Sequence, residues 1–76
     1  MNKKNRVSIQ ECLNRGLSVE DIDVSTVSTH LFSEGEVTSI KDGGINATGL
    51  LVVVEGIHKG EYYRETEYIF NVWCEV

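Results

Sequence analysis

Apolar side chains recur at helical spacing near the start of the chain, within residues 8–15. Three of them stand at positions i, i+3 and i+4 and so form one stripe along a helix: Ile9, Cys12 and Leu13. Ser8 precedes the stripe as an N-cap, and Glu11 stands three residues after it, at the capping-box spacing. Gly16, followed by an apolar residue, is typical of a Schellman ending. The pattern predicts a short helix over residues 8–15, and Ser18 is the cap of a further helical turn.

From Asp23 onward the chain becomes rich in β-branched and aromatic residues, which favour strands. The pattern predicts strands over four ranges: residues 23–32, 36–41, 47–58 and 61–76. Turn residues separate them at 33–35 and, most clearly, at Asp42-Gly43-Gly44. We therefore expect one α+β domain over residues 1–76. It has a flexible lead-in at 1–6, a short N-terminal helix at 8–15, and a four-stranded antiparallel meander within 23–76, with a sheet curled toward a small barrel as the alternative.

The last two predicted strands allow their register to be derived. If Lys59-Gly60 is a two-residue turn, His58 faces Glu61, and Glu55 then faces Arg64 as a cross-strand ion pair. The same face of the sheet carries mostly apolar residues: Leu51, Val53, Ile57, Tyr62, Thr66, Tyr68, Phe70, Val72 and Cys74. We take it as the core face, covered by the N-terminal helix.

The opposite face alternates large apolar side chains with carboxylates, which is unusual for a solvated sheet face. Leu50, Val52 and Val54 belong to it. The predicted partner-binding residues are its members in the last strand: Tyr63, Glu65, Glu67, Ile69, Trp73 and Glu75. Three explanations stay open. The face docks a protein partner, it is covered by a curled sheet or by the N-terminal segment, or it mediates self-association.

Charge argues against nucleic acid as a direct partner. The chain has 12 acids and 7 bases, for a net charge of −5 at pH 7. No base occurs between Arg15 and Lys41, and a secondary acidic patch is predicted there: Glu20, Asp21, Asp23, Glu34 and Glu36. Phosphate binding requires Lys and Arg, and an acidic chain repels a polyanion. There is no apolar run of membrane-spanning length and no signal-peptide pattern, so we expect a cytoplasmic protein with reduced, buried Cys12 and Cys74.

The sequence contains no recognisable catalytic or metal-binding constellation. His30 and His58 stand without a Cys, His or carboxylate at ligand spacing, so we predict no metal, and no cofactor either. Nucleophile-elbow and phosphate-loop patterns are absent, and a domain this small has little volume for a catalytic pocket. We expect that the protein is not an enzyme.

Two stretches resemble known structural motifs. Residues 16–22 followed by 24–31 resemble a helix-turn-helix sequence motif, which would imply a small DNA-binding regulator. The would-be recognition helix has no Arg or Lys, and the segment is short for a positioning helix and a turn. Glu34-Gly35-Glu36-Val37 resembles the opening of an SH3-like or OB-type barrel, but the aromatics of the last strand alternate with Glu instead of the bases that a nucleic-acid-reading barrel uses.

Together these features predict a small acidic protein-binding module, an inhibitor or regulator that occupies a basic surface of a larger partner. Its composition is similar to that of phage-encoded inhibitors of host defence nucleases, such as anti-CRISPR proteins. The alternative is a structural or accessory subunit that self-associates through the Trp73 face, and a small DNA-binding regulator comes third.

Overall fold

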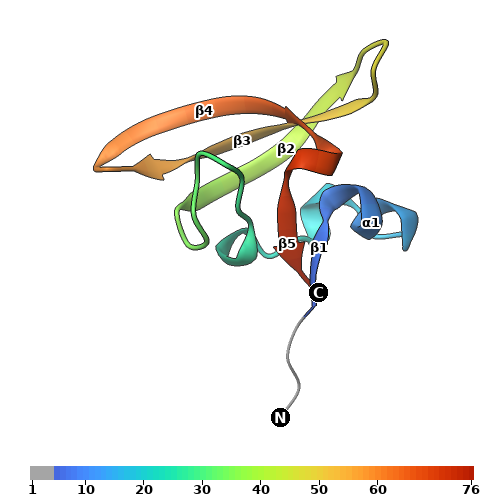
Figure 1. The fold of residues 1–76 in the computed structure, drawn as a ribbon, viewed down its shortest axis with the longest axis horizontal. Helices are drawn as coiled ribbons and strands as arrows, with labels where there is room; N and C mark the ends of the chain where they lie inside the picture. Colours follow the sequence, from blue (N-terminus) through green and yellow to red (C-terminus); the bar gives the residue numbers. More distant parts are fainter. Residues whose placement is uncertain (1–4) are drawn as a thin grey trace.

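A computed structural model describes residues 5–76 as an α+β fold with one short helix and five strands in two antiparallel sheets (Figure 1). β2 (Val37–Ile45), β3 (Leu50–His58) and β4 (Glu61–Tyr68) form the larger sheet, in that order. β1 (Arg6–Ser8) pairs with β5 (Trp73–Glu75) in the smaller one. The remaining elements are α1 (Ile9–Asn14) and three 3₁₀ turns, η1 (Val19–Asp21), η2 (Val24–Thr26) and η3 (Ile69–Asn71). The described residues form no closed barrel.

The predicted N-terminal helix is confirmed, together with both of its ends. Ser8 Oγ accepts a hydrogen bond from the Glu11 amide at 3.2 Å, as an N-cap does. At the other end the Leu17 amide donates to the Cys12 carbonyl and the Gly16 amide to the Leu13 carbonyl, which is the Schellman pattern. Gly16 adopts φ 89°, a conformation that a residue with a Cβ rarely takes.

The predicted register of the last hairpin is also confirmed. His58 pairs with Glu61 and Glu55 with Arg64. The two turn residues, Lys59 and Gly60, both have positive φ, as a type I′ turn requires. The predicted ion pair is not formed among the described residues: the Glu55 carboxylate accepts a hydrogen bond from the Tyr62 hydroxyl and pairs with Lys41, whose Nζ lies 3.7 Å away.

The predicted strand over residues 23–32 is wrong. This segment contains the η2 turn and a single β-bridge between Ser28 and Trp73. Hydroxyl and carboxylate side chains hold the backbone in turns here: Asp23 accepts from the Ser25 amide at 3.0 Å, and Thr29 Oγ1 accepts from two amides farther on. Such local bonds compete with a sheet ladder. Residues 24–31 likewise do not form a recognition helix, since only Val24–Thr26 is helical.

The predicted turn at residues 42–44 is wrong as well, because β2 continues through it to Ile45. The register against β3 shifts between Asp42 and Gly44, which marks a β-bulge, and Gly44 takes φ 90° there. The chain reverses at residues 46–49 instead. Asn46 Oδ1 accepts from the amides of Thr48 and Gly49, an Asx turn of the kind that Asn favours.

The last predicted strand is interrupted, and the predicted lead-in is partly a strand. The η3 turn separates β4 from β5, and Ile69 within it is 7% exposed and joins the core. After β4 the chain leaves the larger sheet, and β5 pairs with β1, so that Arg6 lies opposite Glu75. Asn5 and Val76 extend this pairing with two backbone hydrogen bonds. The rest of the predicted lead-in, residues 1–4, lies outside the described residues.

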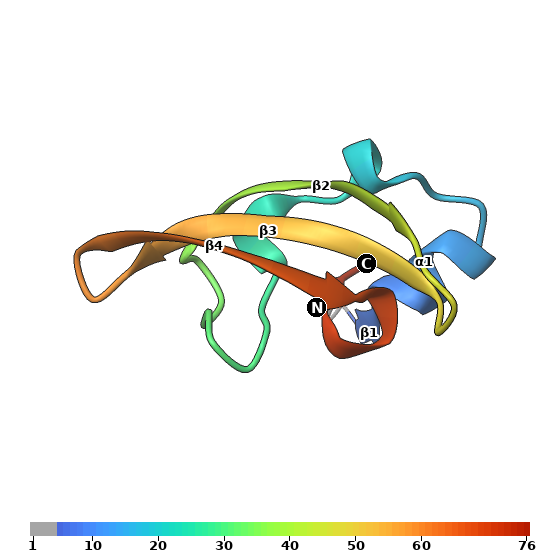
Figure 2. The same cartoon turned by 90° about the horizontal axis from the view of Figure 1, so that it is seen from above.

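The two faces of the larger sheet are the reverse of those predicted. Val52 and Val54 are 1% and 0% exposed, whereas Ile57 is 46% exposed and Leu51 and Val53 are half-buried. The other described elements lie on one side of the sheet (Figure 1), and Figure 2 shows β2, β3 and β4 curving together along their length. We call the covered side the inner face and the opposite side the outer face.

One hydrophobic core connects the inner face to the smaller sheet and α1. Its buried residues come from most elements: Ile9, Cys12, Ile22, Val27, Phe32, Val37, Val52, Val54, Ile69, Val72 and Cys74. Cys12 and Cys74 are free thiols with no exposed surface, and their Sγ atoms lie 3.0 Å apart. Burial, together with the hydrogen bond to Cys12, raises the pKa of the Cys74 thiol to about 12.

Candidate functional site

The six predicted partner-binding residues do not form one row. Tyr63, Glu65 and Glu67 alternate along β4 and face the inner side, opposite Gly56, Val54 and Val52 of β3. The other three lie in or beyond the η3 turn. Ile69 is buried in that turn, and Trp73 and Glu75 lie half-buried in the smaller sheet.

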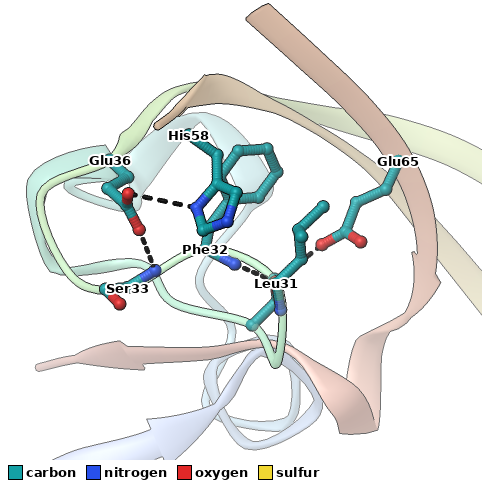
Figure 3. A network of polar contacts seen from close by, with 7 residues as sticks. Leu31, Phe32, Ser33, Glu36, His58 and Glu65 are labelled. Carbon is teal, nitrogen blue, oxygen red and sulfur yellow. Dashed lines mark hydrogen bonds and ion pairs between the residues drawn. The ribbon is translucent and has the colours of Figure 1, made fainter. Parts of the chain in front are cut away.

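Residues 29–36 cover the inner face where β4 carries its carboxylates (Figure 3). Thr29 Oγ1 donates to Glu65 Oε1 at 2.6 Å and accepts from the amides of Leu31 and Phe32, each at 3.0 Å. The Phe32 side chain is fully buried beside β3, so this segment is part of the core. The carboxylate of Glu65 therefore anchors the chain's own loop.

Glu36 and His58 hold the other end of the same segment. Glu36 accepts from the Ser33 amide at 2.5 Å, and its other oxygen lies 3.3 Å from His58 Nδ1 (Figure 3). The Ser33 N–H is the main cause of a lowered pKa at Glu36, and His58 adds to it. The His58 ring meets Phe32 and Tyr63 edge-on, at centroid distances of 6.3 and 6.1 Å. A polar clamp with aromatic sides thus fixes the loop on the sheet.

His30 has carboxylate neighbours that sequence spacing did not reveal. Its Nε2 lies 3.3 Å from Glu67 Oε2, and His30, Glu65 and Glu67 bring their ligand atoms within 4.8 Å of one another. Two of these residues are neighbours on one strand face, but His30 approaches from a loop more than 30 positions away. Only the tertiary fold brings the three together, and within residues 5–76 they form the group of side chains that could hold a metal ion.

The predicted secondary acidic patch divides into separate parts. Glu20 and Asp21 belong to η1 and Asp23 caps η2, and both turns pack against β2. Glu34 lies apart from them and forms an ion pair with Arg6 at 3.5 Å. Glu36 belongs to the clamp with His58 described above. Glu20, Asp21 and Asp23 are therefore the acids of the patch that lie in the two turns packed against β2.

An apolar groove of about 270 Å³ opens beside η1, between the end of α1 and the start of β3. Most of its lining is aliphatic: Leu13, Leu17, Val19, Leu50, Leu51, Val52 and Ile69. The polar lining residues are Ser18 and the acids Glu20 and Asp42, and no base among residues 5–76 lines the groove. Leu17 and Leu50 are both exposed, so part of this apolar lining faces solvent. Sequence reasoning missed the groove because its residues come from four separate stretches of the chain.

The outer face of the larger sheet is a second exposed apolar surface. Ile57, Tyr62 and Phe70 are 46%, 59% and 43% exposed, and the Tyr68 and Phe70 rings stack with centroids 5.1 Å apart. Its charges are mixed, with Lys41, Glu55 and Arg64 close together. This face is thus apolar with charges of both signs, whereas the groove is apolar with acidic edges.

No family model, curated protein or solved structure matches this chain. Within residues 5–76, no helix combines the length and the apolar character that membrane crossing requires.

Proposed function

We propose that this chain is a non-enzymatic protein-binding module whose groove receives an apolar side chain flanked by Lys or Arg from the basic surface of a larger partner. The observation that carries this function is the groove between α1, η1 and β3, with its aliphatic floor and with Glu20 and Asp42 as the charged lining residues in the described part of the chain. Ligand sites are typically concave and apolar with a few placed polar groups, and this groove has that composition.

The groove and the surrounding charge have separate roles in binding. Burial of exposed apolar groups such as Leu17 and Leu50 supplies affinity, at roughly 25 cal/mol per Å² of apolar surface removed from water. The net charge of −5 and the acids of η1 and η2 attract a basic surface and speed association, an effect that salt weakens. Inhibition or regulation of a cytoplasmic protein with a nucleic-acid-binding surface fits this chemistry. A phage-type inhibitor of a host defence nuclease is the member of that class that the composition favours.

Self-association is the second candidate function, and the outer sheet face favours it. The exposed side chains of Ile57, Tyr62 and Phe70 provide apolar surface beside charges of both signs, which suits contact with an identical face better than contact with a basic partner. The surface proposed for self-association is therefore the outer face and not the Trp73 face, because Trp73 lies half-buried in the smaller sheet.

A displayed library of random peptides tests the groove directly. We expect the wild-type domain to enrich peptides that carry an aliphatic or aromatic residue beside Lys or Arg. The double variant Glu20→Lys/Asp42→Lys reverses the rim charge, and it should lose these peptides. Glu61→Lys is the control for a charge reversal away from the groove, because Glu61 begins β4, next to the turn at the opposite end of β3. Absence of enrichment, or equal binding by the rim variant, would remove the groove as the binding site.

A further inference from the structure

The side chains of His30, Glu65 and Glu67 form a cluster on the inner face that the protein-binding function does not use. Glu65 and Glu67 project from the same face of β4, and His30 reaches them from the loop that crosses this face. Figure 3 shows Glu65 directed from its strand toward that loop. The cluster therefore joins two segments that are distant in the sequence.

The geometry of the cluster is close to that of three ligands of one ion. Two ligands bound at about 2.1 Å to a tetrahedral zinc ion are about 3.4 Å apart. His30 Nε2 and Glu67 Oε2 are 3.3 Å apart, and the three ligand atoms lie within 4.8 Å of one another. His30 is exposed, so its ring can rotate toward the carboxylates without disturbing the core.

The surroundings of the cluster orient it and leave charge to be balanced. The Glu67 side chain is only 16% exposed, and Glu65 beside it on the strand is half-buried. Thr29 Oγ1 donates to one oxygen of Glu65, the kind of contact that orients a metal-binding carboxylate. A dication would neutralise both carboxylates at once.

We propose that His30, Glu65 and Glu67 bind a divalent transition-metal ion of the zinc class, with water in the remaining position. Imidazole selects Zn²⁺ and its neighbours over Mg²⁺ and Ca²⁺, which prefer all-oxygen sites. The ion joins the loop at residues 29–33 to β4, so binding stabilises the folded chain by mass action.

Titration of the metal-free protein with ZnCl₂ tests this site. Calorimetry should give saturable binding of one ion per chain, a rise in melting temperature, and much weaker effects with Mg²⁺ or Ca²⁺. His30→Ala and Glu67→Gln should each weaken Zn²⁺ binding by about tenfold or more. Melting curves without metal should change little for His30→Ala, because the His30 side chain is 69% exposed.

Two further measurements distinguish this site from other side chains of the protein that could bind a metal ion. His58→Gln is the matched control, since His58 also lies 3.3 Å from a glutamate but belongs to no group of three possible ligands among the described residues. Its Zn²⁺ affinity should equal that of the wild type. Co²⁺ should bind without a thiolate charge-transfer band, which would otherwise reveal Cys12 and Cys74. Absence of saturable binding, undiminished binding by His30→Ala, or a thiolate band would overturn the proposal.

Discussion

Gly56 is the position where the structure predicts the sharpest loss of stability on a minimal substitution. It lies buried within β3, where the segment that precedes β2 passes against it. A Cβ added at Gly56 would lie 2.3 Å from the Glu36 carbonyl oxygen and 3.0 Å from Phe32 Cε1. The same carbonyl accepts a hydrogen bond from the Ile57 amide at 3.0 Å. Gly56→Ala must therefore move backbone, because no flexible side-chain end is there to yield.

The cost follows from the two contacts that Gly56→Ala disturbs. Loss of a backbone hydrogen bond with a buried group left unpaired costs about 1–3 kcal/mol. Displacement of a fully buried ring costs about 1–3 kcal/mol more. A domain of this size has about 4–11 kcal/mol of total stability. Because each kcal/mol shifts the melting temperature by about 4–8 °C in a small domain, we expect a decrease of at least about 8 °C.

Thermal melts followed by circular dichroism measure this effect, with Ile57→Ala as the control. Ile57 is the next residue, but its side chain is exposed on the outer face, so its truncation should cost well under half as much. A Gly56→Ala variant that melts with the wild type, or above Ile57→Ala, would refute the close packing of residues 32–36 on β3.

Three further outcomes follow from the structure. Below pH 4.5 the domain should lose stability, because the lowered pKa of Glu36 stabilises the fold above its unfolded-state value, and that contribution disappears as pH falls through the folded-state pKa. Urea unfolding at stepped pH should show a smaller acid slope for Glu36→Gln than for Glu34→Gln. In alkali, stability should fall between pH 9 and about 12, because the unfolded chain loses the Cys74 proton before the folded chain does; Cys74→Ala should remove that part of the slope in melts at rising pH. Trp73→Ala should lower the melting temperature without changing peptide binding, because Trp73 packs half-buried in the smaller sheet. An unchanged melting temperature together with weakened peptide binding would instead assign Trp73 to the binding interface.

Local signals in the sequence predicted the helix and the last hairpin correctly. The caps at Ser8 and Gly16 and the two-residue turn at Lys59-Gly60 act over a few residues, so they are legible without the fold. The strand prediction for residues 23–32 was wrong because it rested on β-branched composition. In the structure, the side chains of Asp23 and Thr29 accept hydrogen bonds from nearby backbone amides and stabilise turns.

The inner and outer faces could not be distinguished from the alternation of residues alone. Val52 and Val54 on one face and Leu51 and Val53 on the other are equally apolar. Gly56 was the available signal, because a glycine within a strand often marks close approach of another backbone. The reversal also puts the predicted partner-binding residues Glu65 and Glu67 on the inner face, where Glu65 accepts a hydrogen bond from Thr29 and Glu67 lies beside His30.

The groove and the histidine cluster depend on tertiary structure and had no local signature. Glu20 and Asp42 meet at the groove because η1 packs beside β2, and His30 meets Glu67 because a loop crosses β4. The charge composition of the sequence indicated that the expected partner has a basic surface. The groove proposed to bind that partner could be found only in the folded structure.

Amide chemical-shift mapping tests the central claim most directly. A peptide selected from the library, with an apolar residue beside Lys or Arg, is added to ¹⁵N-labelled protein. We predict that the largest shifts occur at residues 17–21, at 42–44 and at Leu50, around the groove. Shifts concentrated instead at Tyr62, Tyr68 and Phe70 would assign binding to the outer face and contradict the proposed groove.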